Sequence, residues 1–316
     1  MQRIIIDTDP GIDDAAAILM ALASPELSVE AVTTIFGNGP VDMCTVNARR
    51  VLSSAGRTDI LVYQGAAKPL LRPPNPNWAL HIHGNDALGE AGFPSPEESP
   101  QPGESRHAAL ELVGRVMGSP GEITIVALGR LTNVALALSL EPRFAQSVAR
   151  IVVMVGAVYV PGNVSPVASA NLYEDPESAA IVYTSGAPLV QVGLDVCNKV
   201  HISQSQLEQI KQTDTPTTRL LSAATPSLQR SYVERGLLVE GDGVRFNDLP
   251  AVAFMVDPDL FGCSEMFVEI EIHSSTARGQ TVAHHIGHGP GRPYVTVCLE
   301  VDGERAAALF TERLIG

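Results

Sequence analysis

Cysteine is scarce in this chain of 316 residues. The four cysteines, Cys44, Cys197, Cys263 and Cys298, lie far apart and form no CxxC pair. This spacing disfavours a zinc site or a disulfide framework, and it predicts reduced thiols that pack as small hydrophobic side chains.

Positive charge is scarce as well, with 21 Lys and Arg against 35 Asp and Glu and a formal net charge of −14. Because a nucleic acid or an anionic membrane would repel such a surface, neither is expected as the main partner, and a small-molecule ligand is favoured. Long apolar runs are also missing: none approaches the roughly 18 residues of a spanning helix, and MQRIIIDTDP contains no signal-peptide core. A cytoplasmic location is therefore expected.

Short β-branched runs alternate with Ala- and Leu-rich stretches along most of the chain. RIIID at 3–7 precedes DDAAAILMALAS, and VEAVTTIFGN at 29–38 precedes VNARRVLSSAG. Parallel strands need crossover connections, so this alternation predicts one α/β domain over 1–316, with a mostly parallel central sheet flanked by helices. The last two strand candidates are MFVEIEIH and PYVTVCLEV, and the Pro-rich segment 72–104 is expected to be an extended surface loop.

The first strand runs into Asp7-Thr8-Asp9-Pro10-Gly11-Ile12-Asp13-Asp14-Ala15, which carries four carboxylates within eight residues. Capping of the following helix accounts for one or two of them, because the positive end of a helix dipole favours anions. It does not account for Asp7 and Asp9, since like charges crowded behind a buried strand need a cation to offset them. All-oxygen ligands indicate Ca²⁺ or Mg²⁺. The motif therefore predicts a divalent metal site at the carboxyl end of the sheet, where ligands bind in open parallel folds.

The opening motif resembles the signature of the nucleoside hydrolases, the inosine-uridine preferring, calcium-dependent N-ribohydrolases. The resemblance covers nearly the whole chain. Its further pieces are Val32-Thr33-Thr34 with Gly37-Asn38, His81-Ile82-His83-Gly84, Ala127-Leu128-Gly129-Arg130-Leu131-Thr132-Asn133, Gly162-Asn163, Asn171 with Asp175-Pro176-Glu177, and Asn247-Asp248-Leu249-Pro250-Ala251-Val252-Ala253.

This resemblance implies the nucleoside hydrolase fold and hydrolysis of the N-glycosidic bond of purine or pyrimidine ribonucleosides, giving ribose and free base. It implies that Ca²⁺ is held by the carboxylates of Asp9, Asp14 and Asp248 and by the backbone carbonyl of Leu128. Asp9 would also accept the proton of the attacking water. The family usually forms homodimers or homotetramers, so a homo-oligomer is expected.

The resemblance also implies a set of substrate contacts. Asp13 would accept a hydrogen bond from the ribose 2′-hydroxyl, and Asn38, Asn163 and Asn171 would hold the other sugar hydroxyls. His83 would contact the base or the ribose. Apart from the resemblance, the segment 227–235 and the Gly-rich stretch after it suggest a lid in which Tyr232 closes over the nucleobase, and a solvated helix and loop explain the segment equally well.

Two positions depart from the family pattern. Many members have a histidine just before the last calcium-binding aspartate, where it protonates the leaving purine, and this chain has Asn247. An amide is no general acid at neutral pH, so His83, a residue after Ala224 or no residue at all would assist the leaving base. Many members also have a glutamate that meets the 5′-hydroxyl, and this chain has Ser169 there, which leaves room for a 5′-modified riboside.

Three alternatives stay open at this point. The Asp7-Thr8-Asp9 pair also matches the haloacid dehalogenase phosphatases, but Gly11 stands where that family has Thr or Val. Asn247 and Ser169 are compatible with a catalytically weak riboside-binding protein on the same fold. Taken alone, Asp248 is best interpreted as the N-cap of a helix that starts at Leu249, with Pro250 in its first turn.

Overall fold

The sheet at the centre of the molecule is built from strands in the order β3-β2-β1-β4-β5-β6-β9-β7-β8. The computed structural model describes residues 1–73, 78–93, 105–285, 287–289, 291–292 and 294–316. Within that part of the chain the strands are β1 (Gln2–Thr8), β2 (Leu27–Thr34), β3 (Val62–Gln64), β4 (Ile123–Ala127), β5 (Arg150–Val153), β6 (Leu189–Val192), β7 (Phe261–Ile270), β8 (Thr281–His285) and β9 (Val295–Val301).

Strand direction confirms the predicted mostly parallel sheet. Every pair from β3 through β6 to β9 is parallel, whereas β7 runs antiparallel to both of its neighbours, β8 and β9. The two last strand candidates correspond to β7 and β9. β8, whose five residues lie between them, was not predicted from the sequence.

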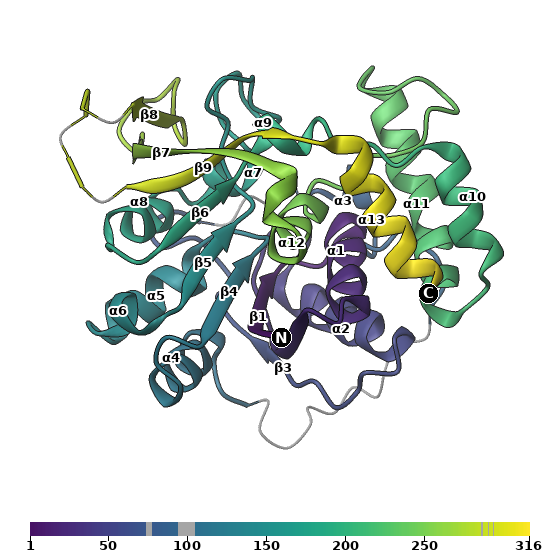
Figure 1. Ribbon diagram of the computed structural model, residues 1–316, viewed down its shortest axis with the longest axis horizontal. Coiled ribbons are helices and arrows are strands. Elements are labelled where there is room, and N and C mark those ends of the chain that lie inside the picture. Colours follow the sequence, from purple (N-terminus) through teal and green to yellow (C-terminus); the bar gives the residue numbers. More distant parts are fainter. Residues whose placement is uncertain (74–77, 94–104, 286, 290, 293) are drawn as a thin grey trace.

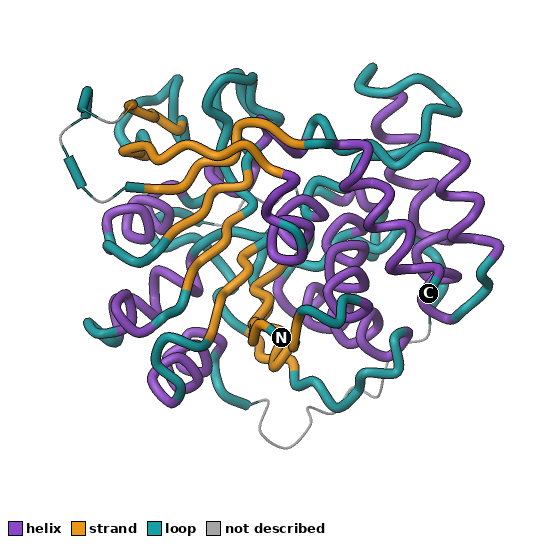
Figure 2. Tube along the Cα trace, viewed as in Figure 1, coloured by secondary structure: helices purple, strands orange, loops and turns teal. Residues whose placement is uncertain are grey.

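Helices cover both faces of the sheet (Figures 1 and 2). They are α1 (Ile12–Ala23), α2 (Val41–Ser54), α3 (Leu80–His83), α4 (Ala108–Gly118), α5 (Thr132–Leu140), α6 (Phe144–Ser147), α7 (Ala170–Glu174), α8 (Pro176–Thr184), α9 (Leu194–Cys197), α10 (Gln204–Gln212), α11 (Pro216–Glu234), α12 (Leu249–Val256) and α13 (Gly303–Ile315), with the 3₁₀ turn η1 (Pro258–Leu260). The four-residue α3 falls within the segment predicted to be an extended loop, of which 74–77 and 94–104 lie outside the described residues.

The two faces of the sheet bury separate cores, as the alternation of side chains along a strand requires. Ile4 and Ile6 of β1 join the core beneath α1, α2 and α11 to α13, whereas Ile5 joins the core beneath α4, α5 and α8. All three isoleucines are fully buried. The strand that leads into the acidic motif is therefore fixed from both sides.

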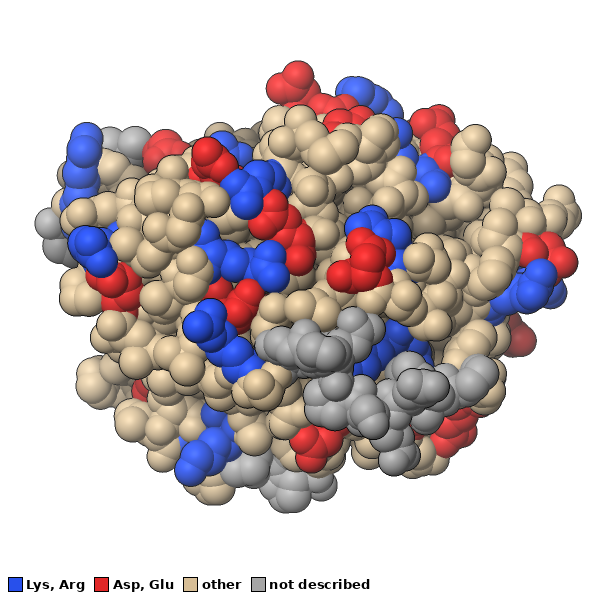
Figure 3. All heavy atoms as spheres, turned by 90° about the horizontal axis from the view of Figure 1, so that it is seen from below, with Lys and Arg blue, Asp and Glu red and all other residues tan. Residues whose placement is uncertain are grey.

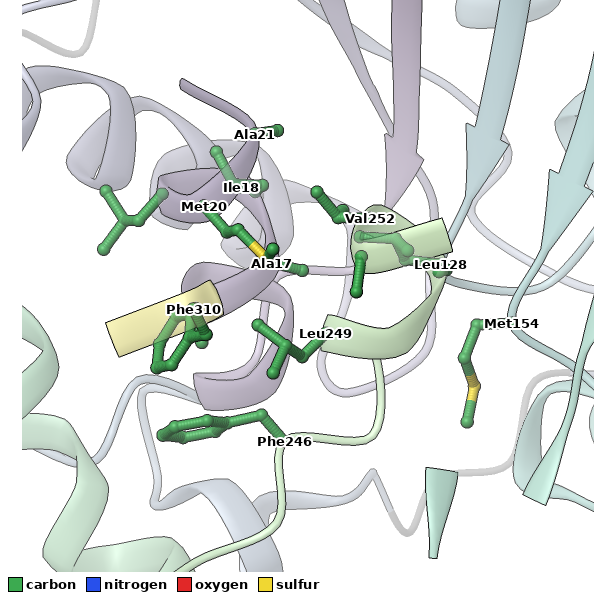
Figure 4. Packing of buried hydrophobic residues seen from close by; sticks show 14 of the residues in the cluster. Ala17, Ile18, Met20, Ala21, Leu128, Met154, Phe246, Leu249, Val252 and Phe310 are labelled. Atoms are coloured by element: carbon green, nitrogen blue, oxygen red, sulfur yellow. The ribbon is translucent and has the colours of Figure 1, made fainter. Parts of the chain in front are cut away.

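A hydrophobic contact between helices fixes the position of the acidic motif (Figure 4). Ala17 and Met20 of α1 share a core with Leu249 and Val252 of α12 and with Phe310 of α13. Fully burying one such Leu or Phe side chain contributes about 1.5–3 kcal/mol. This packing brings the first turn of α1 close to the first turn of α12, although the two helices are far apart in the sequence.

The acidic excess of the chain lies partly in its interior. Figure 3 shows acidic and basic side chains intermixed on one face of the molecule. The buried aspartates of the described chain are Asp7, Asp9, Asp13, Asp14, Asp175, Asp195 and Asp248. A buried carboxylate is stable only with donors or cations around it. Backbone amides meet this need at Asp175 and Asp195, whereas the aspartates around the start of α1 point to a site.

Two of the cysteines that are distant in sequence meet in the sheet. Cys263 of β7 pairs with Cys298 of β9, and their Sγ atoms are 3.2 Å apart. Cys263 is exposed, which corrects the expectation that all four thiols are packed inside, whereas Cys298 and the other two are buried.

Among the helices of the described residues, none is long and apolar enough to cross a membrane.

Candidate active site

The predicted site residues gather where neighbouring parallel strands end. Asp9 follows β1, Asn38 lies beyond the end of β2, and Leu128 follows β4. Because β1 pairs with both β2 and β4 in parallel, these strand ends lie at one edge of the sheet. This arrangement places backbone and side-chain oxygens from three strands around the start of α1.

Three buried carboxylates form a compact group at this edge. Oxygens of Asp13, Asp14 and Asp248 lie within 4.8 Å of one another. Asp14 accepts hydrogen bonds from the Gly11 amide at 2.9 Å and from Asn38 Nδ2 at 2.9 Å, so it also caps α1. The Oδ1 atom of Asp13 is buried and has no hydrogen-bond partner.

Asp248 occupies the N-cap position of α12, but its side chain makes no capping hydrogen bond. The capping interpretation of Asp248 is therefore wrong for the carboxylate, which belongs to the acidic group instead. Burial raises the pKa of Asp248 well above its ordinary value, and the charges of Asp13, Asp14 and Asp9 raise it further. The ionised Asp248 carboxylate therefore repels the neighbouring carboxylates unless a cation lies between them.

The same forces act on Asp13. Burial and then the charge of Asp14 raise the pKa of Asp13 to about 7, against the opposing effect of backbone N–H groups that include the Asn247 amide. A group of oxygen ligands that repel each other and retain an unpaired buried oxygen has the chemistry of a hard divalent cation site.

Asp9 lies beside this group and forms an ion pair with an arginine side chain. Its Oδ2 atom accepts the Asn38 amide at 2.7 Å and is ion-paired with Arg130 Nη1. Both side chains are buried. Burial raises the pKa of Asp9 well above its ordinary value, while the positive charge of Arg130 opposes the shift.

His83 approaches the acidic group from the short helix α3. The Ile12 amide donates to His83 Nδ1 at 3.2 Å, and the same ring atom lies 3.8 Å from Asp13 Oδ1. Burial lowers the pKa of His83 to about 3, assisted by the charges of Arg130 and His81. The imidazole is therefore neutral, with Nδ1 as acceptor and Nε2 as its only N–H donor.

Asn247 and Tyr232 contact each other. Asn247 Nδ2 donates to Tyr232 Oη at 3.2 Å, and the Arg245 guanidinium lies 5.7 Å from the centre of the tyrosine ring. Tyr232 is buried in the helix α11, which includes most of the segment 227–235. Burial, followed by the charge of Asp13, raises the pKa of Tyr232 above its ordinary value, and the phenol keeps its proton.

The remaining predicted sugar contacts are engaged by backbone groups. Asn171 Nδ2 donates to the Leu128 carbonyl at 2.6 Å and to the Met154 carbonyl at 2.9 Å. Ser169 is buried, and its Oγ accepts the Gly156 amide at 2.8 Å. Asn163 is exposed and accepts the Ala170 amide through Oδ1 at 2.9 Å. These three side chains hold the loops around the site in place.

Comparison with known proteins decides the family. The family model described as "Inosine-uridine preferring nucleoside hydrolase" matches residues 4–308. The chain belongs to this family. It is therefore a nucleoside hydrolase, an enzyme that hydrolyses ribonucleosides.

Individual relatives agree with this assignment. The "Probable uridine nucleosidase 2" of Arabidopsis thaliana is 37% identical, over 99% of this chain and 98% of that protein. The "Pyrimidine-specific ribonucleoside hydrolase RihA" of Citrobacter koseri is 36% identical, over 98% of this chain and 97% of that protein. The solved plant nucleoside hydrolase PpNRh1 superposes with a TM-score of 0.93 at 38% identity, covering 100% of this chain and 99% of that one. The nucleoside hydrolase fold expected from the sequence is confirmed.

Nucleoside hydrolases are generally metal-dependent, and the residues present here fit a metal ion. The acidic group offers three carboxylates and a buried oxygen on Asp13 that has no hydrogen-bond partner. It differs in one respect from the ligand set that the resemblance implied. Asp13 lies within the group, whereas Asp9 lies beside it and pairs with Arg130.

Two charged residues of this nucleoside hydrolase site, Arg130 and Glu174, were not predicted from the sequence. Arg130 lies between Asp9 and Glu174, and its ion pair with Glu174 measures 2.9 Å. Arg130 is the only charged residue of the stretch Ala127–Asn133 directly after a buried strand, and that position was an available signal. Glu174, at the end of α7, carried no such signal.

Proposed function

We propose that this nucleoside hydrolase uses Ca²⁺ to hydrolyse the N-glycosidic bond of ribonucleosides, with pyrimidine ribosides such as uridine as its preferred class. The acidic group Asp13, Asp14 and Asp248 carries the proposal, because three converging buried carboxylates favour a hard cation that accepts irregular oxygen coordination. The pyrimidine preference rests on the names of the two relatives and on the amide at position 247.

The residues proposed to hold the ion are Asp14, Asp248, Asp9 and the carbonyl of Leu128, with Asp13 close enough to contribute. When bound, Ca²⁺ supplies an anchor for vicinal ribose hydroxyls and lowers the pKa of a coordinated water. Asp9 accepts a proton from the attacking water through the carboxylate oxygen that Arg130 and Asn38 leave free. Asp13 accepts a hydrogen bond from the 2′-hydroxyl, and its negative charge stabilises the oxocarbenium-like transition state.

Asn38 and Asn171 lie within this arrangement and are proposed to orient the remaining hydroxyls, and Asn163 is proposed to do so from the loop above. Ser169 faces the position of the 5′-substituent in this proposal. His83 donates its Nε2 hydrogen to the substrate as a neutral imidazole. The homo-oligomer expected from the resemblance stays a prediction.

The leaving base requires a partner other than a histidine at position 247. Tyr232 keeps its proton and accepts a hydrogen bond from Asn247, so its own O–H is free to donate to the departing base. A pyrimidine that leaves as a stabilised anion needs a hydrogen bond rather than full protonation. Because position 247 holds no histidine that could protonate a leaving purine, we propose that pyrimidines are preferred over purines.

The test is ribose release, measured by a reducing-sugar assay, from uridine, cytidine, inosine, adenosine and guanosine. We expect release from uridine with added Ca²⁺ and a fall of at least about 100-fold after chelation, because the acidic group then lacks its cation. Restoring Ca²⁺ should recover the rate. Chelator-resistant release would remove the metal from the proposal. No release by protein shown to hold Ca²⁺ would redirect the assay to 5′-modified ribosides, and then to the riboside-binding alternative.

Replacing Asn247 by histidine tests the missing acid. We expect Asn247→His to raise the rate of inosine cleavage by about tenfold or more, because a general acid next to the leaving purine contributes on the order of 10²–10⁴ in favourable cases. Uridine cleavage should change less. The kcat ratio of inosine to uridine is the measurement, and an unchanged ratio would place leaving-group activation elsewhere.

A further inference from the structure

Arg130 is buried among the carboxylates of the site. It follows β4 by three residues and is 3% exposed. Its Nη1 pairs with Asp9 Oδ2, and its Nε and Nη2 lie 3.0 and 2.9 Å from Glu174 Oε2. The guanidinium thus bridges two acidic side chains that come from different elements of the fold.

Asp9 is held through one oxygen. Its Oδ2 accepts both Arg130 and the Asn38 amide. Both of these donors bind Oδ2, and none of the described residues donates a hydrogen bond to Oδ1, which leaves that oxygen available to other partners.

The surrounding backbone is closely fitted to this pair. A Cβ atom added to Gly37 would lie 2.1 Å from both Arg130 Nη1 and Asp9 Oδ2, and one added to Gly129 would lie 2.4 Å from Asp9 Oδ1. Only glycine leaves room at these two positions. The ion pair is therefore accommodated by the chain on both sides, which is what a fixed orientation of Asp9 requires.

We propose that Arg130 is a positioning residue for the reaction. It holds Asp9 Oδ2 so that Oδ1 alone faces the metal ion and the attacking water, and its positive charge limits the affinity of the acidic group for that divalent cation. The proposal rests on the proposed function. Glu174 anchors the guanidinium from the side away from Asp9. Arg130 therefore sets the orientation of the general base Asp9 and leaves the substrate class unchanged.

Charge and geometry make separable contributions. Loss of the charge removes repulsion between the guanidinium and a nearby divalent cation, so metal binding becomes tighter. Loss of the planar guanidinium frees the Asp9 side chain to rotate away from the attacking water. A displacement of about 1 Å lowers the rate on the order of 10²-fold. A merely structural arginine would weaken metal binding and turnover together.

The experiment compares Arg130→Met and Arg130→Lys with the wild-type chain. Ca²⁺ affinity is measured by titration calorimetry on chelator-stripped protein, and kcat and KM are measured with uridine. We expect Arg130→Met to bind Ca²⁺ about tenfold more tightly while its kcat falls about 100-fold and its KM changes little. Arg130→Lys should bind Ca²⁺ as the wild type does and still lose at least about tenfold in kcat, because an ammonium group lacks the planar fork.

Arg278→Met is the matched control. Arg278 is also buried, and it forms an ion pair of 2.8 Å with Glu177, a residue outside the acidic group. This variant should lower the melting temperature and leave Ca²⁺ affinity and kcat near the wild-type values. It measures the cost of losing a buried ion pair as such.

Unchanged kcat in Arg130→Met, or weaker Ca²⁺ binding together with lower kcat, would overturn the inference. A wild-type kcat in Arg130→Lys would overturn the proposal that the planar guanidinium orients Asp9. If Arg130→Met does not fold, Arg130→Lys and Glu174→Gln carry the test, and the latter should lower kcat by loosening the guanidinium. If the wild type binds Ca²⁺ but releases no ribose, the proposed function fails, while the Ca²⁺ affinities still decide whether Arg130 limits metal binding.

Discussion

Asp9→Asn is expected to lower kcat for ribose release by about 10⁴ or more while riboside binding stays within a few-fold of wild type. The substitution keeps the shape of the side chain, and its carbonyl oxygen still accepts from Arg130 and the Asn38 amide. An amide, however, does not take a proton from the attacking water, and general-base catalysis is worth about 10²–10⁴. Loss of one negative ligand beside the cation adds to that effect.

Single-turnover ribose release under saturating uridine and Ca²⁺ measures this effect, and calorimetry with the unreacted nucleoside measures binding. Asp175→Asn serves as control, since Asp175 is a fully buried aspartate that caps α8 and is not a member of the acidic group. It should lower the melting temperature and keep kcat. Near-normal turnover of Asp9→Asn would assign the base to another carboxylate.

The second large effect is expected for Asp248→Asn. We expect Ca²⁺ binding to weaken by at least about 100-fold and uridine hydrolysis to fall with it, because the site loses a charged ligand. We also expect the chelator-stripped variant to be more stable than the wild type. Asp248 makes no capping bond and lies among like charges, so its removal relieves repulsion without sacrificing a hydrogen bond of the helix.

Scanning calorimetry in chelator and in Ca²⁺ separates the two effects. The melting temperature in chelator should rise by about 2 °C or more, whereas the stabilisation by Ca²⁺ should largely disappear. Asp257→Asn, at the opposite end of α12, is the matched control, because Asp257 caps η1 and lies outside the acidic group. Wild-type Ca²⁺ affinity in Asp248→Asn would remove this residue from the metal site, and a lower melting temperature in chelator would mean that its carboxylate supports the fold.

Local pattern was enough to predict the elements that carry the site. β-branched runs such as Ile4 to Ile6 are typical of buried parallel strands. The turn-forming residues around Gly11, between the strand and the helical stretch, predict where α1 begins. The carboxylates of Asp13 and Asp14 are adjacent in sequence, so their place in the first turn of α1 follows from that boundary. The fold class and the acidic edge of the sheet were therefore predictable.

Local pattern did not predict the antiparallel end of the sheet. β8 is short and ends in His284 and His285, which resemble loop residues, and its strand character comes from pairing with β7. The contact between Cys263 and Cys298 has the same origin, since 35 residues separate them along the chain and only the register of β7 on β9 brings them together. The intrinsic strand propensity of a segment affects strand formation less than its packing and pairing with a neighbouring strand.

The sequence by itself determined the family, the mostly parallel sheet and the concentration of aspartates behind β1, because these follow from residue order and short-range periodicity. Only the tertiary structure decided that Asp248 is a member of the acidic group rather than a helix cap, and that Asp9 is clamped by Arg130, 121 residues away. Such pairings depend on which strand ends and helix starts the packed core brings together. A buried charge then takes the partner that this packing places within reach.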